Sequence, residues 1–268
     1  MRLLDYTLRF AVVAYLIGAL ALYLMQDRLL LPAVPDAADL RTVTHAGDDI
    51  DVWNAHGVYA GYVVTPTEQE PRGTFVLYHG NEESAETKLP LADVFVRAGY
   101  RVVIVEYPGH SKRRGERTMK AALVASRDAL SAALSQWHGP VYLVGESLGA
   151  GMASQVVKGN EPVIAGVVLI TPWDSLANVA AEKYPIFPVP WMLHDIFDSV
   201  AAVSRYDGPL VIVGAQQDAL IPVAHARRFA GEHDHARLML LPTAGHDDWI
   251  GAMTPQDWRR ILQWLKAG

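Results

Sequence analysis

The stretch Val141-Tyr-Leu-Val-Gly145-Glu146-Ser147-Leu148-Gly149 decides how the rest of the chain is interpreted. An apolar run ends in the pattern Gly-x-Ser-x-Gly, and the residues that follow, 150–157, are compatible with a helix. Strand, sharp turn and helix form the context in which this pattern exposes a serine oxygen. A serine at such a tip strains the backbone, so the flanking glycines must let chain segments approach closely. Taken alone, the pattern also fits a glycine–serine turn before a packed helix.

Composition limits the classes of protein that the chain can be. Its 268 residues are 51% hydrophobic, which fits one large α/β domain with an attached segment. The net charge is −6, and the one basic cluster, Lys112-Arg113-Arg114, is too short for a binding stripe, so we expect no nucleic-acid partner. The absence of cysteine excludes a disulfide scaffold, a cysteine-ligated metal and a cysteine nucleophile.

The first thirty residues contain an apolar segment. No charged residue occurs from Phe10 to Gln26, and Leu29-Leu30-Leu31 extends the apolar character, so the segment is long enough to cross a hydrocarbon core of about 30 Å. A cleaved signal peptide would have a shorter run and a small-x-small site, where this chain has Tyr23-Leu24-Met25-Gln26. A buried core helix is a third interpretation. We predict a single-pass membrane anchor of the signal-anchor type over residues 1–31.

The charges beside this segment favour one orientation. Arg2, Arg9 and the amino terminus precede it, and only Asp5 opposes them. The positive-inside rule then places the N-terminus in the cytoplasm and the main domain outside, in the periplasm if the organism is bacterial.

From residue 36 to 268 the composition is that of a soluble domain. Short, nearly continuous apolar runs alternate with helical patterns, which predicts an α/β fold with a mostly parallel, doubly wound sheet. An initial hairpin supplies an antiparallel edge. A proline-punctuated, aromatic insertion at about 172–206 predicts a helical lid. We expect strands at 50–53, 58–64, 74–78, 101–105, 141–145, 163–170, 210–213 and 238–241, and helices at 84–98, 118–136, 224–231 and from 254.

The ends of the last two strands supply an acid and a base. Asp218 follows the strand at 210–213, and His246 follows the strand at 238–241. A serine hydroxyl needs a base to become a nucleophile, histidine titrates near neutrality, and a carboxylate orients the imidazole. The order Ser, Asp, His is typical of one hydrolase fold. As alternatives, Asp218 could cap the turn before Pro222, and His246 could be a surface histidine.

Other residues near these positions are weaker candidates. Asp247 and Asp248 neighbour the base but cannot easily reach its far nitrogen. The histidines at 225, 233 and 235 are expected on the surface of the preceding helix. After the third strand, Asn81 N–H is placed to join Leu148 N–H as a donor to a developing oxyanion. His79 is expected to be structural in this loop. Glu82 and Glu83 either face solvent or favour a cationic substrate group.

At this point the chain resembles the α/β-hydrolases, and within them the membrane-anchored serine hydrolases of the Bem46-like and ABHD-like group. The resemblance implies Ser147 as nucleophile, Asp218 as acid, His246 as base, and the N–H groups of Asn81 and Leu148 as the oxyanion hole. It covers nearly the whole chain and rests on Gln26-Asp27-Arg28-Leu-Leu-Leu-Pro32, His79-Gly80-Asn81, Gly145-Glu-Ser-Leu-Gly149, Pro172-Trp-Asp-Ser175, Tyr184-Pro185, Asp218 to Pro222 and Gly245-His246.

Two departures from the group concern the pocket mouth. Glu82-Glu83 stands where small neutral residues are usual, and Glu106-Tyr-Pro-Gly stands where Asp-Tyr-Arg-Gly is common. Both departures concern the choice of substrate rather than the chemistry.

These observations predict a serine hydrolase that needs no metal and no cofactor. It would cleave an ester, a thioester or an amide of a small-molecule or acyl substrate at a membrane surface. The expected pocket residues are His79, Glu82, Trp173, Tyr184 and Trp191. Two alternatives stay open. One is a serine aminopeptidase-like peptidase, in which Glu82 or Glu83 would hold a free amino terminus. The other is a non-catalytic binding protein with the same fold.

Overall fold

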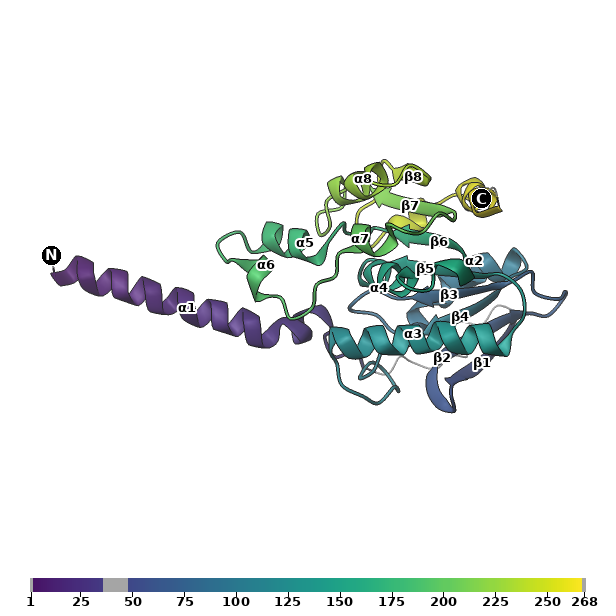
Figure 1. The fold of residues 1–268 in the computed structure, drawn as a ribbon, viewed down its shortest axis with the longest axis horizontal. Helices are drawn as coiled ribbons and strands as arrows, with labels where there is room; N and C mark the ends of the chain where they lie inside the picture. Colours follow the sequence, from purple (N-terminus) through teal and green to yellow (C-terminus); the bar gives the residue numbers. More distant parts are fainter. Residues whose placement is uncertain (1, 36–47, 267–268) are drawn as a thin grey trace.

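The core of the structure is one eight-stranded sheet with the strand order β1-β2-β4-β3-β5-β6-β7-β8 (Figure 1). The computed structural model describes residues 2–35 and 48–266, with side chains for 5–35 and 49–266. The strands are β1 (Asp48–Ala55), β2 (Val58–Pro66), β3 (Thr74–Tyr78), β4 (Arg101–Val105), β5 (Val141–Glu146), β6 (Ile164–Ile170), β7 (Leu210–Ala215) and β8 (Ala236–Leu241).

The sheet is parallel except at one edge. β1 pairs antiparallel with β2, and β2 pairs antiparallel with β4, whereas the pairs from β4 to β8 are parallel. The predicted α/β fold and its antiparallel edge are therefore confirmed. The central strands are buried on both faces, as in β3 and β5, where every residue is buried. This explains why they read as continuous apolar runs rather than as an alternating pattern.

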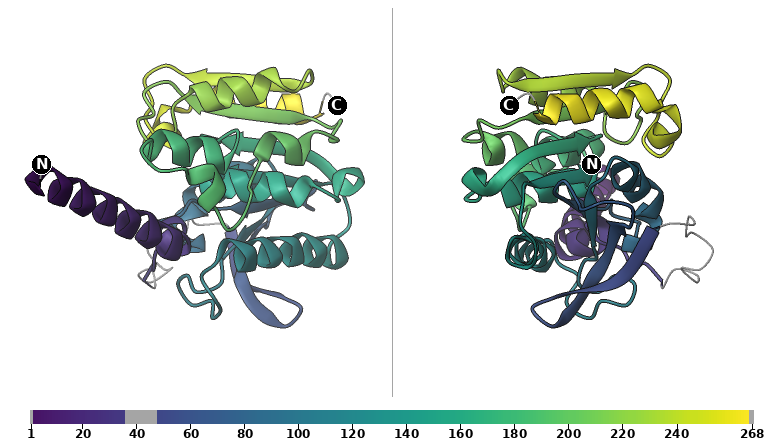
Figure 2. Two further views of the ribbon diagram at one scale, coloured as in Figure 1. Left: turned by 60° about the vertical axis from the view of Figure 1, so that its left-hand side comes forward. Right: turned by 90° about the vertical axis from the view of Figure 1, so that its right-hand side faces the viewer.

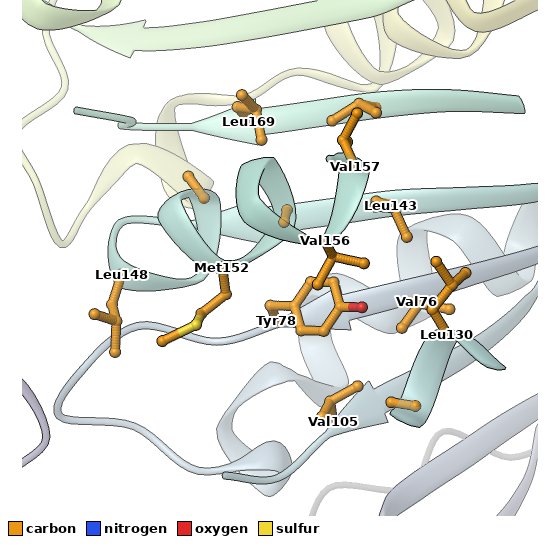
Figure 3. Packing of buried hydrophobic residues seen from close by; sticks show 14 of the residues in the cluster. Val76, Tyr78, Val105, Leu130, Leu143, Leu148, Met152, Val156, Val157 and Leu169 are labelled. Atoms are coloured by element: carbon orange, nitrogen blue, oxygen red, sulfur yellow. The ribbon is translucent and has the colours of Figure 1, made fainter. Parts of the chain in front are cut away.

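Helices cover both faces of the sheet (Figure 2). On one face, the side chains of α3, α4, α7 and α8 pack into the first core cluster, part of which is shown in Figure 3. On the other face, α2, α9 and α10 pack into the second cluster. The bounds are α2 (Leu89–Arg97), α3 (Met119–Gln136), α4 (Leu148–Val157), α7 (Ser199–Val203), α8 (Ala224–Gly231), α9 (Trp249–Ala252) and α10 (Pro255–Lys266).

Local sequence explains where these helices begin. The Thr118 hydroxyl accepts a hydrogen bond of 3.1 Å from Ala121 N and caps α3, as expected of a threonine at this position. The predicted helix at 84–98 is divided: a short 3₁₀ helix, η2 (Ala85–Lys88), precedes α2, which carries Pro90 in its first turn.

The lid lies between β6 and α7. It contains α5 (Leu176–Lys183) and α6 (Val189–Met192), and a β-bridge between Ser175 and Asp198 closes its base. Leu176 N donates to Phe197 O (2.8 Å), which reinforces this closure. The two ends of the lid segment, near Ser175 and Asp198, therefore lie side by side.

The first helix, α1 (Arg2–Leu30), contains an apolar segment, Asp5–Leu30, that is long and apolar enough to cross a membrane. Its N-terminal half projects away from the sheet, and its C-terminal half runs beside the lid (Figures 1 and 2). At its end, Asp27 Oδ1 accepts a hydrogen bond of 3.2 Å from Met119 N, the first residue of α3. The helix is thereby joined to the domain that contains the sheet by a specific contact.

Candidate active site

The turn between β5 and α4 holds Ser147 in a strained conformation. Its backbone has φ 53° and ψ −116°, a region that residues with a Cβ rarely occupy. The flanking glycines are required sterically. A Cβ at Gly145 would overlap the carbonyl oxygen of Gly149, and a Cβ at Gly149 would overlap that of Tyr78. The sequence-based explanation of the two glycines is therefore confirmed.

Ser147, His246 and Asp218 form a continuous hydrogen-bonded chain. His246 Nε2 lies 2.9 Å from Ser147 Oγ, and His246 Nδ1 lies 2.7 Å from Asp218 Oδ2. The other oxygen of Asp218 accepts hydrogen bonds from Leu220 N (2.9 Å) and Ile221 N (2.7 Å). Asp218 thus caps the turn and contacts the histidine at the same time, so the two interpretations of this residue are compatible.

The surroundings of His246 change its basicity. Partial burial lowers the pKa of this histidine, but the hydrogen bond and the charge of Asp218 outweigh burial and raise the pKa above its ordinary value of 6.5. The negative charges of Asp247 and Glu146 act in the same direction. The imidazolium form is stabilised, as a base that takes a proton from Ser147 requires.

The neighbouring candidates have other partners. Asp248 Oδ1 accepts from Gly245 N (2.6 Å), and Asp247 is exposed to solvent. His225, which we expected on a surface, is fully buried, with Nδ1 at 2.7 Å from Asp174 Oδ1. The expectation was wrong because the helix face that carries His225 packs on the base of the lid, which sequence neighbours alone do not reveal.

Asn81 and Leu148 line the same pocket as Ser147. Leu148 is the first residue of α4, so its N–H is among those that have no partner within the helix. The N–H of Gly80, in contrast, donates to Glu83 Oε2 (2.7 Å). The loop after β3 therefore has a fixed shape beside the serine.

His79, a predicted pocket residue, and Glu106, expected at the pocket mouth, both support this loop. His79 is buried, with Nε2 at 3.0 Å from Glu106 Oε1, and Glu106 also accepts from Ala85 N (3.0 Å). His79 lies outside the pocket lining, so its assignment as a substrate-pocket residue was wrong and its expected structural position is the one observed. Glu106 is likewise buried and not at the pocket mouth.

The two acidic residues after Asn81 differ from each other. Glu82 is exposed and outside the pocket lining, which corrects its assignment to the pocket. Glu83 accepts from Lys88 Nζ (2.6 Å) as well as from Gly80. Lys88 also pairs with the buried Glu146, whose Oε1 accepts from Trp249 Nε1 (2.7 Å). Burial raises the pKa of Glu146. Because Glu146 directly precedes Ser147, the contacts of Glu146 with Lys88 and Trp249 support the turn that carries the serine.

An apolar pocket begins at Ser147 and extends between the lid and α1. Its empty space is about 970 Å³ with the open mouth included. Trp173 and Tyr184 line it as predicted, whereas Trp191 is 90% exposed and lies outside it, because α6 turns that ring away. The lining consists of Leu22, Gln26, Leu29, Leu30, Asn81, Ser147, Leu148, Trp173, Leu176, Val179, Ala180, Lys183, Tyr184, Val189, Met192, Leu193, Leu220 and Ile221.

Sequence reasoning missed the contribution of α1 to this wall. The available signal was the spacing of Leu22, Gln26 and Leu29-Leu30, which places these residues on one helix face. Gln26, a polar residue at the end of an apolar helix, also indicated a contact partner.

A charged cluster, which we call the lid clamp, was also missed. It consists of Asp174, Glu182, His225 and Arg228. Asp174 Oδ2 accepts from Arg228 Nε (2.6 Å), and His225 Nε2 lies 3.2 Å from Glu182 Oε2. Burial would raise the pKa of Asp174, but the hydrogen bonds from His225 and Arg228 hold it well below its usual value. The clamp joins the base of the lid to α8.

Among the described residues, no group of three or more His, Asp or Glu side chains is arranged to hold a metal ion.

Comparisons with known proteins agree with this architecture. Residues 69–199 match the model of a family described as serine aminopeptidase, S33. Rv2307c, an uncharacterized protein of Mycobacterium tuberculosis, is 26% identical over 246 residues, which cover 89% of this chain and 87% of that protein.

Solved structures show the same fold. The Pyrococcus furiosus esterase PF2001 superposes with a TM-score of 0.67 at 16% identity and covers 88% of this chain and 96% of its own. Est1E of Butyrivibrio proteoclasticus, solved with ferulic acid, gives a TM-score of 0.66 at 16% identity and covers 80% of this chain and 98% of its own. The chain therefore has the α/β-hydrolase fold.

Proposed function

We propose that this protein is a serine hydrolase that cleaves an ester, thioester or amide bond through an acyl-enzyme on Ser147, at a membrane surface. The observation that carries the proposal is the hydrogen-bonded chain from Ser147 Oγ through His246 to Asp218, with distances of 2.9 and 2.7 Å. Its members come from the ends of β5, β7 and β8, where parallel sheets hold their ligands.

The proposed reaction has two halves. His246 takes the proton of Ser147 Oγ as the oxygen attacks the substrate carbonyl, and the N–H groups of Asn81 and Leu148 donate to the resulting oxyanion. The imidazolium, held by Asp218, then gives its proton to the leaving alcohol, thiol or amine, and the acyl-enzyme remains. In the second half a water molecule, deprotonated by His246, releases the acid and restores Ser147.

The pocket favours an acyl substrate over an aminoacyl one. Of the described residues that line it, Lys183 is charged and none is acidic. A peptidase that holds a free amino terminus needs a carboxylate in the pocket. Glu82 is exposed outside the lining, and Glu83 is bound to Gly80 and Lys88. These contacts support an esterase or thioesterase rather than an aminopeptidase, despite the name of the matched family.

We further propose that α1 anchors the enzyme in the membrane, as in the Bem46-like serine hydrolases. The apolar segment supports this assignment. Arg2 and Arg9 near its start support a cytoplasmic N-terminus with the catalytic domain on the opposite side.

A fluorophosphonate probe tests the chemistry, because it reacts only with an activated serine. The full chain in detergent should be labelled at Ser147, and Ser147→Ala should abolish labelling, with peptide mass spectrometry to locate the adduct. A Ser154→Ala variant is the control, because Ser154 is buried within α4 and bonded to Ala150 O (2.8 Å). A folded parent that is not labelled and does not turn over esters would overturn the proposal and leave the non-catalytic alternative.

A further inference from the structure

The lid is held against the apolar helix along several turns. The rings of Tyr15 and Phe187 stack with centroids 5.1 Å apart, and those of Tyr23 and His194 meet edge to face at 4.6 Å. At Gly18 the same Phe187 ring approaches so closely that a Cβ would lie 3.2 Å from it. The contact therefore starts halfway along α1 and continues to its end.

Gln26 fixes the lid by both ends of its amide. Its Nε2 donates to Met192 O (3.1 Å), and its Oε1 accepts from His194 N (2.8 Å). An amide in an apolar helix needs such partners, because an unsatisfied polar group in hydrocarbon is costly. Gln26 is the one amide side chain in the uncharged stretch Phe10–Gln26. It therefore binds the backbone of the lid with the polar group that this stretch provides.

The length of α1 determines how deep the lid lies. Its uncharged stretch, Phe10–Gln26, is about 26 Å long at roughly 1.5 Å per residue, and a hydrocarbon core is about 30 Å thick. A bilayer crossed by α1 must therefore include nearly all of this stretch. The lid contacts it from Tyr15 to Gln26. The lid tip, defined as residues 184–193, is then at membrane depth.

The composition of the lid tip suits that depth. No charged residue occurs from Tyr184 to Leu193. Ile186 is 70% exposed and Trp191 90%, and Ile196 just beyond is 81% exposed, whereas the apolar side chains exposed elsewhere on the domain are scattered. Strongly exposed apolar side chains that are grouped in one segment beside an apolar helix are the pattern of a membrane-inserted loop.

The backbone of the lid tip is also suited to an apolar medium. Prolines at 185, 188 and 190 have no N–H to satisfy. The N–H groups of Phe187 and Val189 donate to Tyr184 O (3.1 Å) and Phe187 O (2.8 Å). Those of Trp191 and Leu193 donate to Pro188 O (3.0 Å) and Val189 O (3.2 Å). Irregular backbone in a bilayer requires such internal partners.

From these contacts we infer that the lid tip inserts into the bilayer beside α1, and that the pocket between them admits the hydrocarbon chain of a bilayer-resident acyl ester directly from the membrane. The inference rests on the proposed function and specifies its substrate class. The pocket is lined by Leu22, Leu29 and Leu30 of α1, by Val189, Met192 and Leu193 of the lid, and by Ser147. A chain that enters between them keeps its carbonyl at the serine and its tail in apolar surroundings.

The absence of cysteine makes insertion directly measurable. A single Ile186→Cys variant of the full chain, labelled with a polarity-sensitive fluorophore in phosphatidylcholine vesicles, should be quenched by bromolipid and shielded from iodide. Val58→Cys, at an exposed position in the β1–β2 hairpin region, is the control and should show the opposite. Iodide quenching of the Ile186→Cys label equal to that of the Val58→Cys label would overturn insertion of the lid.

A chain-length comparison tests the occupant of the pocket. The substrates are 4-methylumbelliferyl acetate in solution and 4-methylumbelliferyl palmitate in the same vesicles. Leu22→Trp should reduce the ratio of palmitate to acetate turnover at least about tenfold, because the larger ring fills the pocket wall. Leu20→Trp, on the exposed face of α1, should leave both rates unchanged.

The two proposals fail differently. An unlabelled Ser147 with no turnover of either ester refutes the serine hydrolase. Normal labelling and acetate turnover, with a palmitate-to-acetate ratio that Leu22→Trp and Leu20→Trp affect equally, refutes only the acyl pocket between α1 and the lid.

Discussion

At Gly149 the chain has no room for a side chain, because a Cβ there would overlap the carbonyl oxygen of Tyr78 at the end of β3. We expect Gly149→Ala to destabilise the fold by about 1–3 kcal/mol, or roughly 2–4 °C in Tm per kcal/mol for a chain of this size. Turnover should fall further, because the displaced turn moves Ser147. Gly251→Ala in α9, where a Cβ meets open space, is the control. A Gly149→Ala variant with the wild-type Tm would contradict the steric argument.

His246 should give the reaction an acid limb. Its pKa is raised above 6.5 by Asp218, and only the neutral imidazole can accept the serine proton. The kcat/KM for 4-methylumbelliferyl acetate should therefore rise with pH through a pKa above 6.5. Asp218→Asn removes the charge and the acceptor at Nδ1, so we expect kcat to fall by about 10³–10⁴-fold and the acid limb to move to lower pH.

The pH dependence of kcat/KM for Asp247→Asn distinguishes the effect of a nearby negative charge on His246 from the effect of the hydrogen bond that Asp218 forms with it. Asp247 is exposed and raises the pKa of His246 through its charge. The variant should lower the acid limb slightly and leave the plateau rate within about twofold. If it lost as much activity as Asp218→Asn, the assignment of the acid would be wrong.

At the scale of elements, the lid clamp should control both stability and its dependence on pH. Asp174 is buried, but the side chain of its partner Arg228 is 46% exposed, so Asp174→Asn should destabilise the chain at pH 7 by less than the about 3–5 kcal/mol that breaking a fully buried ion pair costs. The pKa of Asp174 is depressed in the fold, so its stabilisation is present above the ordinary value of 3.8 and is lost as pH falls below it. The difference in unfolding free energy between variant and parent should therefore shrink at pH 3.

Chemical denaturation of the full chain in detergent at the two pH values measures this difference. Asp198→Asn is a matched control, because Asp198 caps α7 through Ala201 N (2.9 Å) and has no cationic partner in the clamp. Its effect should be smaller and should not depend on His225 or Arg228. An equal loss for Asp174→Asn at both pH values would contradict a charge-based clamp.

The elements themselves were predictable where local sequence determines them. Strands such as β3 and β6 are buried on both faces, so their sequences are continuous apolar runs with ends within a residue of those predicted. The same reasoning placed Ser147, Asp218 and His246 at the carboxyl ends of parallel strands, where the structure brings them together. Their positions follow from topology and need no knowledge of side-chain packing.

What could not be predicted depends on contacts between distant segments. His225 looks like an exposed helix residue until the lid base is placed against α8. Trp191 looks like a pocket aromatic, and its exposure follows from the direction in which α6 turns. Helical periodicity identifies α1 but does not show that Leu22 and Gln26 face the pocket. In each case the environment of the side chain is set by segments that are distant in the sequence, and local sequence patterns do not show which distant segments come into contact.

At the scale of the whole molecule, α1 is a wall of the proposed substrate pocket as well as a candidate anchor. The proposed catalytic side chains all lie at the ends of β5, β7 and β8, whereas Leu22, Leu29 and Leu30 supply only apolar lining. The helix is also attached independently of the lid, through Asp27 and the first residue of α3. The proposed chemistry and the proposed selectivity for long acyl chains therefore depend on different parts of the chain and should be separable.

A chain that begins at the buried Leu31, and so lacks α1, tests whether the chemistry is independent of the wall that α1 provides. We expect fluorophosphonate labelling of Ser147 to persist, because the hydrogen bonds described for the side chains of Ser147, Asp218 and His246 involve one another and the turn after β7 rather than α1. The ratio of palmitate to acetate turnover, measured in one detergent for both chains, should fall at least about tenfold, or roughly 1.4 kcal/mol, since part of the apolar wall is gone. Circular dichroism must first show that the shortened chain is folded. A folded, labelled chain with the parental ratio would mean that the lid and Trp173 alone form the long-chain pocket, and that α1 serves only as an anchor.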